Sequence, residues 1–360
     1  MNRIDQLRER MTSENVDLVA IGAGAHLAWL TGLKPHADER ALLLCVSQHY
    51  AGFLMPSLEA GSNRANTDLP FHEWSDSDGP KAALLSLLKA CEAMDAGSLV
   101  LDETMRADFA ALVYDHLPKA RRQFCETTLG ALRLTKGDDE FALLKQSALL
   151  ADGAMQAAWG EMTPGMSELD VAAIVRRHFL TNEAKPLFNI VGSGGNGAFP
   201  HHSTGDTLLR EGDAVVMDIG AELNGYPSDI TRSAVIGEKP ADYDTVYSIV
   251  ESAIQAALEA AKPGAIAKDI DLAARTVIEQ AGYGEFFMHR LGHGLGVEVH
   301  EPPYITSTDN TVIEEGMVFS IEPGIYLPGQ FGIRLEDIVI IRSDGPEILS
   351  DLPRDAHIIG

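Results

Sequence analysis

The first 130 residues alternate between short apolar runs and segments in which apolar residues recur at helical spacing. The short runs are typical of buried strands, and the spaced segments are typical of helices that cover a sheet. The predicted strands are residues 16–21, 41–46, 51–55 and 98–101, and the predicted helices are residues 2–14, 82–94 and 106–117. Strands that alternate with helices predict a small α/β domain, residues 1–130, whose end lies near the polar stretch 126–137.

The rest of the chain, residues 131–360, carries a second pattern that occurs twice. In each copy a long helix is followed by a Pro-Gly pair, a shorter helix, and then strands and glycine-rich turns. The predicted helices are residues 138–159 and 168–180 in the first copy and residues 243–261 and 268–281 in the second, with Asp138 and Ser167 expected to cap the first two. The Pro-Gly pairs begin at Pro164 and Pro263, which are 99 residues apart. This spacing predicts a second, α+β domain with two similar halves.

Four acidic residues follow the same repeat. Asp218 lies at the end of one apolar run and Asp229 begins the next, and Glu322 and Glu336 occupy the corresponding places 104 and 107 residues later. A hairpin brings its two strands together, so each half is expected to supply two carboxylates to one site. Four carboxylates in an apolar pocket cannot all be ionised without cations, and two divalent ions would balance their charge. The alternative is that these acids cap turns or pair with arginines on the surface.

Histidines extend this candidate metal site. His289, His293 and His300 fall within 12 residues, and glycines flank the middle one. Glycines allow a backbone to approach a ligand closely, so His293 is the candidate metal ligand and the other two are expected to border the substrate. His201, which lies 17 residues before Asp218, is a further candidate.

Composition narrows the classes of function. The chain has 53 acidic residues against 28 lysines and arginines, and its formal net charge is −25. Such a surface repels phosphate backbones and anionic membranes, so we expect no nucleic-acid or membrane partner. Three cysteines without metal-site spacing, and an N-terminus without an apolar stretch of signal-peptide length, predict a cytoplasmic protein.

Seven short blocks carry a resemblance to a known family. They are Pro200-His201-His202, Met217–Gly220, Ser228–Arg232, Gly292–Gly294, His300-Glu301, Ile321–Tyr326 and Arg334–Asp337. In order and spacing they resemble the pita-bread metallopeptidases, which include prolidase, aminopeptidase P and methionine aminopeptidase. The resemblance implies a pita-bread catalytic domain over residues 131–360. The leading α/β domain, residues 1–130, is similar to the creatinase-like N-terminal domain of prolidases and aminopeptidases P.

The resemblance also implies roles for the candidate residues. The implied metal ligands are Asp218, Asp229, His293, Glu322 and Glu336, with Asp229 and Glu336 bridging both ions. Because the set offers oxygens and one imidazole, Mn²⁺ or Co²⁺ is expected. The implied catalytic residues are His201 and His300, as donors to the developing oxyanion, and Glu322, as proton shuttle; the implied substrate-binding residues are His289 and Arg334.

Arg334 has two possible roles on the sequence alone. Its guanidinium could hold a metal-binding carboxylate in place, or it could bind the C-terminal carboxylate of a dipeptide. The resemblance implies hydrolysis of the Xaa-Pro bond in a proline-containing di- or oligopeptide, by a homodimer. Prolidase is the leading expectation. The alternatives are an aminopeptidase P that acts on longer peptides, a hydrolase of a small non-peptide amide, and a non-catalytic binding scaffold.

Overall fold

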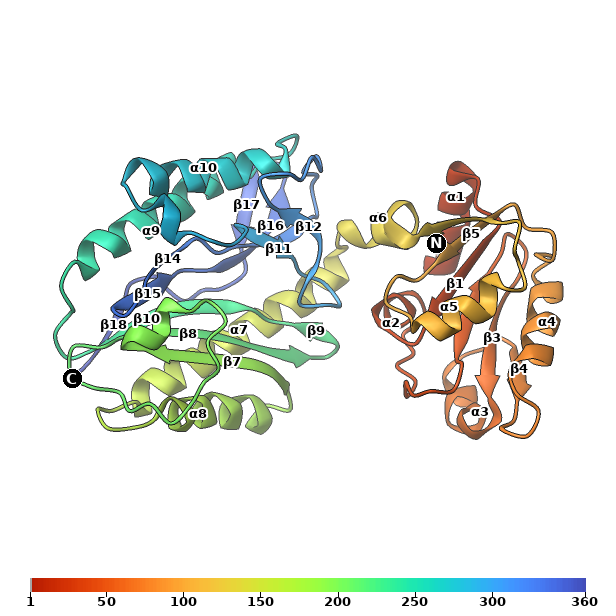
Figure 1. Ribbon diagram of the computed structural model, residues 1–360, viewed down its shortest axis with the longest axis horizontal. Coiled ribbons are helices and arrows are strands. Elements are labelled where there is room, and N and C mark those ends of the chain that lie inside the picture. Colours follow the sequence, from red (N-terminus) through yellow and green to blue (C-terminus); the bar gives the residue numbers. More distant parts are fainter. Residues whose placement is uncertain (1) are drawn as a thin grey trace. The chain divides into compact units, whose positions relative to one another are not determined.

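The computed structural model describes residues 2–360, and the chain divides into two compact units, Met1–Arg133 and Leu134–Gly360 (Figure 1). No helix in the described part of the chain is long and apolar enough to cross a bilayer. The three cysteines are buried free thiols.

The first unit is built on one six-stranded mixed sheet with the strand order β4-β3-β2-β1-β5-β6. Its strands are β1 (Leu18–Gly22), β2 (Leu43–Val46), β3 (Ala51–Pro56), β4 (Phe71–Trp74), β5 (Ser98–Leu101) and β6 (Arg121–Phe124). Its helices are α1 (Arg3–Glu14), α2 (Ala25–Thr31), α3 (Ser57–Asn63), α4 (Lys81–Ala90), α5 (Ala107–Tyr114) and α6 (Leu129–Leu134). Leucines of α4 and aromatic and aliphatic residues of α5 pack on the sheet and form the core.

Five elements of this unit do not show in the apolar pattern, because they are short or polar. Strand β6 pairs in parallel with β5 although its residues are mostly exposed, so it has no apolar run to mark it. Helix α2 ends at Gly32, which adopts a φ of 75°. Helix α6 lies within the polar stretch 126–137, near which the sequence predicts the end of the first domain. The others are α3 and β4.

The second unit contains two five-stranded sheets and a separate two-stranded one. The first sheet consists of β7 (Lys185–Ser193), β8 (Ala214–Leu223), β9 (Tyr226–Pro227), β10 (Ile230–Ile236) and β18 (His357–Ile359). The second consists of β11 (Gly292–Gly294), β12 (Glu301–Ile305), β13 (Val318–Ile321), β16 (Asp337–Arg342) and β17 (Gly345–Ile348), and β14 (Gly324–Leu327) pairs with β15 (Phe331–Arg334).

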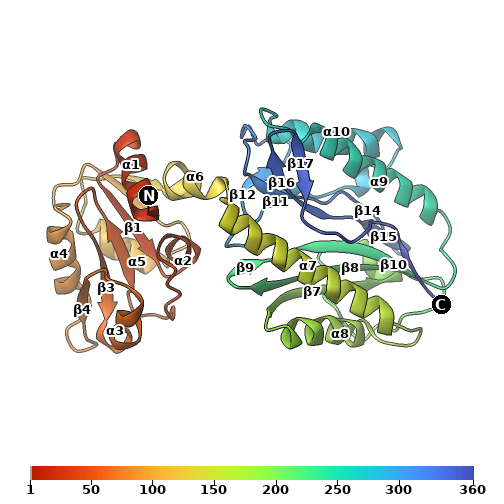
Figure 2. The same ribbon diagram turned by 180° about the vertical axis from the view of Figure 1, so that it is seen from behind.

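Each half of this unit has a helix pair that packs on its own sheet. The pairs are α7 (Asp138–Glu161) with α8 (Glu168–Thr181), and α9 (Tyr243–Ala260) with α10 (Ala267–Gln280). Helix α7 lies across β8 and β10 (Figure 2). Ser167 caps α8 as predicted, but α7 begins at Asp138 itself, so its N-cap is Gly137.

The internal repeat extends to single hydrogen bonds. Gly165 and Gly264, which follow the two repeated prolines, both adopt a φ of 88°. The N–H of Gly165 donates to the carbonyl of Leu209, and the N–H of Gly264 donates to that of Ile313, both over 2.8 Å. The two halves therefore share a backbone plan as well as an order of elements.

Candidate functional site

All nine residues singled out from the sequence line one cavity of about 530 Å³. They are His201, Asp218, Asp229, His289, His293, His300, Glu322, Arg334 and Glu336. Both halves of the second unit contribute to the cavity, from β8 and the residue before β10 on one side and from β11, β15 and the residue after β13 on the other.

Strand alternation and register explain how the carboxylates meet. In β8, Met217 and Ile219 point into the core beneath α7 and α8, so Asp218 between them points to the opposite face. Asp218 is paired across the sheet with Thr231, which places Asp229 near it, just before β10. In the other half, the pairing of Ile321 with Asp337 places Glu322 and Glu336 together just beyond the ends of β13 and β16.

The carboxylate and imidazole atoms form overlapping groups that are small enough to hold metal ions. Asp218, Asp229 and Glu336 each offer a ligand atom within 4.8 Å of the others, and so do His293, Glu322 and Glu336. Glu336 belongs to both groups. Asp229 also groups with His293 and His300. The geometry therefore offers two neighbouring positions for cations with shared carboxylates between them.

The hydrogen bonds of His293 test whether a cation fits. Its Nδ1 lies 3.1 Å from the carbonyl oxygen of Gly294, which can only accept, so Nδ1 carries the proton. Burial lowers the pKa of His293 to about 3, so the ring is neutral and Nε2 presents a lone pair. That lone pair lies 3.4 Å from Glu322 Oε1 and 3.6 Å from Asp229 Oδ2. Three electron-rich atoms face one another, and a cation between them removes the repulsion.

Burial of the acids leads to the same conclusion. Desolvation, and then repulsion from Glu336, raise the pKa of Asp229 well above its usual value. Desolvation and neighbouring carboxylates raise the pKa of Glu336 in the same way, and burial raises that of Glu322 to about 7. Divalent cations would restore the ionised forms, so the donor set fits two such ions.

Arg334 is buried and almost fully engaged by the protein. Its guanidinium donates to Thr231 Oγ1 over 3.1 Å, to the carbonyl of Pro200 over 3.2 Å and to the hydroxyl of Tyr326 over 2.9 Å. A fourth bond, of 2.5 Å, goes to Asp218 Oδ2. Four of the five N–H donors of an arginine are thus used. The other oxygen of this acid, Oδ1, is buried without a hydrogen-bond partner, as expected of an atom that would bind a cation.

The other histidines differ in their freedom. His289 Nδ1 donates to the carbonyl of Arg290 over 2.7 Å, and Nε2 accepts from the hydroxyl of Tyr326 over 2.8 Å, so both nitrogens are engaged. His300 is stacked edge-on against His293, with 4.0 Å between ring centroids. His300 and His201 are exposed at the cavity, where they can meet a substrate.

The sequence did not identify the apolar residues that line the cavity, nor one arginine side chain, that of Arg290. Leu187, Phe188, Ile190, Pro200, Val299 and Arg290 also line this cavity. Leu187 and Phe188, which are neighbours in β7, both face the cavity because the strand's register shifts between Pro186 and Phe188 and so breaks the alternation of a regular strand. The ring of Phe188 packs where Gly220 has no side chain: a Cβ there would lie 2.4 Å from it.

The loop that carries His300 is fixed by a buried ion pair. Lys136 Nζ lies 2.9 Å from Glu301 Oε1, and both side chains are at most 3% exposed. Removing one partner from such a pair leaves a buried charge without its counter-ion, which costs about 3–5 kcal/mol.

We therefore expect Lys136→Met to lower the free energy of unfolding by about 3–5 kcal/mol in urea titrations. Adding Glu301→Gln to this variant should recover most of the loss, because the uncompensated charge is gone. Lys145→Met is the matched control: its amine pairs with the 71% exposed carboxylate of Asp351, and a surface pair contributes about 0–1 kcal/mol. Equal destabilisation by the two lysine substitutions would contradict the prediction.

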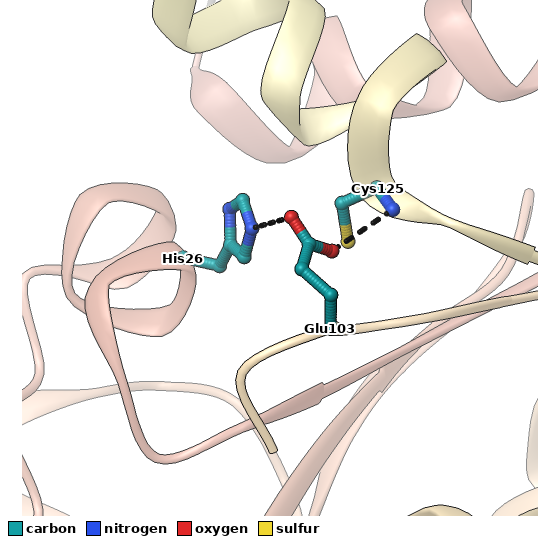
Figure 3. A group of neighbouring side chains, drawn as sticks. All are labelled: His26, Glu103 and Cys125. Atoms are coloured by element: carbon teal, nitrogen blue, oxygen red, sulfur yellow. Dashed lines mark hydrogen bonds and ion pairs between the residues drawn. The ribbon is translucent and has the colours of Figure 1, made fainter. Parts of the chain in front are cut away.

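A second cluster, in the first unit, consists of His26, Glu103 and Cys125 (Figure 3). Arg133 Nη1 lies 3.0 Å from His26 Nδ1, and a guanidinium only donates, so Nε2 carries the proton and donates to Glu103 Oε1 over 3.3 Å. Burial opposes ionisation of Glu103, but bonds from His26 and from the N–H of Cys125 lower its pKa to about 2. Burial raises the pKa of the Cys125 thiol. With a proton on His26 Nε2 and on the thiol, the cluster is a set of hydrogen bonds that joins α2 to Glu103 and the turn at Cys125, and Arg133 adds α6 to it.

Comparisons with known proteins agree with this architecture. Residues 142–343 match the metallopeptidase family M24, and residues 3–134 match the Creatinase/Prolidase N-terminal domain. The chain is 34% identical over 355 residues to a Xaa-Pro dipeptidase of Pyrococcus horikoshii, and the match covers 98% of each chain.

Two solved structures are similar over nearly their whole length. The dipeptidase PepE of Mycobacterium ulcerans superposes with a TM-score of 0.93 at 32% identity, covering 99% of this chain and 97% of that one. An X-Pro aminopeptidase of Thermotoga maritima gives a TM-score of 0.88 at 29% identity, covering 100% of both.

The chain therefore belongs to metallopeptidase family M24, and it carries a creatinase-type N-terminal domain. The predicted fold class, an α/β domain followed by a pita-bread domain with an internal repeat, is confirmed. Membership of this family implies an enzyme that acts with divalent metal ions, for which the cavity has a fitting donor set.

Proposed function

We propose that this enzyme hydrolyses the Xaa-Pro bond of dipeptides with two divalent ions, Mn²⁺ or Co²⁺. The observation that carries the proposal is the pair of overlapping ligand groups that share Glu336. The proposed metal ligands are Asp218, Asp229, His293, Glu322 and Glu336. Oxygen donors with a single imidazole suit these hard or borderline ions. The dipeptidase name of the Pyrococcus relative supports the substrate class.

The protein's own groups then have distinct tasks. When bound, the metal ions polarise the substrate carbonyl and make a water molecule a better nucleophile. Glu322 accepts a proton from the attacking water and passes it to the proline nitrogen as the C–N bond breaks. His300 and His201 donate to the carbonyl oxygen as its negative charge grows. Arg334 keeps Asp218 in its orientation through the hydrogen bond between them.

Further parts of the proposal concern the oligomeric state, the location and the domain boundary of the protein. We propose that the protein is a homodimer in the cytoplasm. We also propose two domains, residues 1–130 and 131–360, whose boundary lies three residues before that between the two compact units. Light scattering at micromolar concentration measures the oligomeric state, and a monomer would contradict the proposed dimer.

A substrate panel tests the function. The metal-loaded enzyme should hydrolyse Xaa-Pro dipeptides faster than Xaa-Pro-Yaa tripeptides, and both faster than dipeptides without proline. A preference for the tripeptides would favour the aminopeptidase alternative, in keeping with the Thermotoga relative. Activity only on small non-peptide amides, or none on any amide, would overturn the proposal.

A further inference from the structure

Arg290 is a second guanidinium in the cavity, and it differs from Arg334 in having donors to spare. Arg290 directly follows His289 in the chain, lines the cavity and is partly exposed. Within the described chain no carboxylate lies at ion-pair distance from Arg290, whereas Arg334 is engaged by four hydrogen bonds. A cation that faces a substrate cavity without an acidic partner is suited to an anionic group of the substrate.

The protein holds this guanidinium in place by packing. The carbon at its centre lies 4.7 Å from the ring centroid of Tyr304, on β12. Stacking on a ring leaves the N–H groups at the edge of the guanidinium plane open to an in-plane partner. The backbone on either side is also fixed, because Arg275 donates to the carbonyl of His289 over 2.9 Å and the N–H of Leu291 donates to Asp271 over 3.0 Å.

The charge of Arg290 acts on the same space as the candidate metal ligands. Arg290 lines the same cavity as His300 and Glu322. The four carboxylates would balance the charge of two bound divalent ions, so a negatively charged substrate group needs a further cation as its own partner. In an Xaa-Pro dipeptide that group is the carboxylate of the proline itself.

We propose that Arg290 binds the free carboxylate of the dipeptide by a two-pronged hydrogen bond, and so sets a preference for dipeptides over longer or amidated substrates. The inference rests on the proposed function. It assigns to Arg290 the carboxylate-binding role for which the sequence alone offered Arg334. Arg290 is thereby a specificity-determining residue that touches substrate but not the reacting atoms.

The test compares Ala-Pro with Ala-Pro amide, which differ only in the group that Arg290 would bind. Wild-type enzyme should show the lower KM for the free acid. Arg290→Met keeps an apolar side chain on Tyr304 but loses the charge, and it should raise KM for Ala-Pro by about 10- to 100-fold while leaving KM for the amide unchanged. Arg290→Lys should fall between, because a point charge does not reproduce the fork.

A binding measurement gives a second readout that needs no turnover. Calorimetry with L-proline should show the same loss of affinity in Arg290→Met, and prolinamide should bind both proteins alike. Arg342→Met is the matched control, since its guanidinium is also stacked on a ring, that of Phe141 at 4.2 Å, but lies outside the cavity lining. It should behave as wild type.

The outcomes separate this inference from the proposed function. If Arg290→Met raised KM equally for Ala-Pro and Ala-Pro amide, or changed KM for neither, the role of Arg290 would be overturned. Hydrolysis of Ala-Pro by the wild-type enzyme would still support the proposed function. Failure of the wild-type enzyme to cleave Xaa-Pro substrates would instead overturn the function, and the inference with it.

Discussion

Glu336→Gln should remove bound metal and lower kcat/KM by about a thousandfold or more. Glu336 belongs both to the group with Asp218 and Asp229 and to the group with His293 and Glu322, so its loss affects both cation positions. Glutamine keeps the size of the side chain and an oxygen that can accept the 2.7 Å bond from Thr231. Only the negative charge is lost. Metal content by mass spectrometry and steady-state kinetics measure the two effects.

The same variant should be more stable than wild type when both are free of metal. Burial and neighbouring carboxylates raise the pKa of Glu336, so its charged form is unfavourable in the folded protein. Neutralising it removes this cost and should raise the Tm of the second unit in the metal-free protein by about 2–4 °C, which corresponds to roughly 1 kcal/mol in a unit of about 150–250 residues. Added metal should then stabilise wild type but not the variant.

A control and a contrary result define this prediction. Glu347→Gln changes an exposed acid of β17 that pairs with Arg342 over 2.6 Å, and it should leave metal content and kcat/KM unchanged. Wild-type metal stoichiometry in Glu336→Gln would contradict the assignment of this residue as a shared ligand.

The candidate ligands could be predicted because the sequence itself carries the features that mark them. Each acid adjoins an apolar strand, and the 99-residue repeat relates the two halves of the second unit. The turn between β8 and β9 falls at Asn224 and Gly225, whose φ angles are 52° and 90°. Residue type, alternation and repeat spacing predicted that these side chains share one site, and they line one cavity in the structure.

The features that the sequence did not predict depend on contacts between segments that are distant in the chain. Both Arg334 and Arg290 stand beside candidate ligands, and only the structure shows that the first is engaged by Thr231, Pro200, Tyr326 and Asp218 while the second is open to the cavity. The apolar wall from β7 depends on a register shift that no local pattern marks. Strand β6 is polar and is defined by its pairing with β5.

Removing the metal ions should abolish activity and make the stability of the protein fall with rising pH above about pH 6.5. Chelation followed by added Mn²⁺ or Co²⁺ should reverse both effects. The pH dependence follows from the buried groups of the cavity, whose contributions have opposite signs below this pH and one sign above it.

The sign follows from which state binds more protons. Glu322, Glu336 and Asp229 have raised pKa values in the folded protein, so above their unfolded values of 4.5 and 3.8 the folded state holds protons that the unfolded state has released. Their contribution to stability is therefore lost as pH rises. Desolvation lowers the pKa of His293 to about 3 and of His289 to about 4, so these rings favour the folded state increasingly as pH rises to 6.5.

Above pH 6.5 the histidines are neutral in both states, and the carboxylates alone remain. Glu322 titrates near pH 7, and Asp229 and Glu336 have pKa values well above their usual range. Each proton that only the folded state holds lowers its stability by about 1.4 kcal/mol per pH unit. Cations replace these protons, so metal-loaded protein should lack this dependence, and metal binding should release protons into the buffer.

Thermal unfolding at pH 6.5, 7.5 and 8.5, with chelator and with Mn²⁺, measures the effect as a rise in Tm on metal addition that grows with pH. Glu336→Gln should flatten the curve of the metal-free protein, because one of the titrating carboxylates is gone. Groups elsewhere that titrate in this range affect both proteins equally and cancel in the comparison. A metal-free wild type whose Tm follows the same pH curve as Glu336→Gln would show that the buried carboxylates do not carry the charge that the metal ions are inferred to balance.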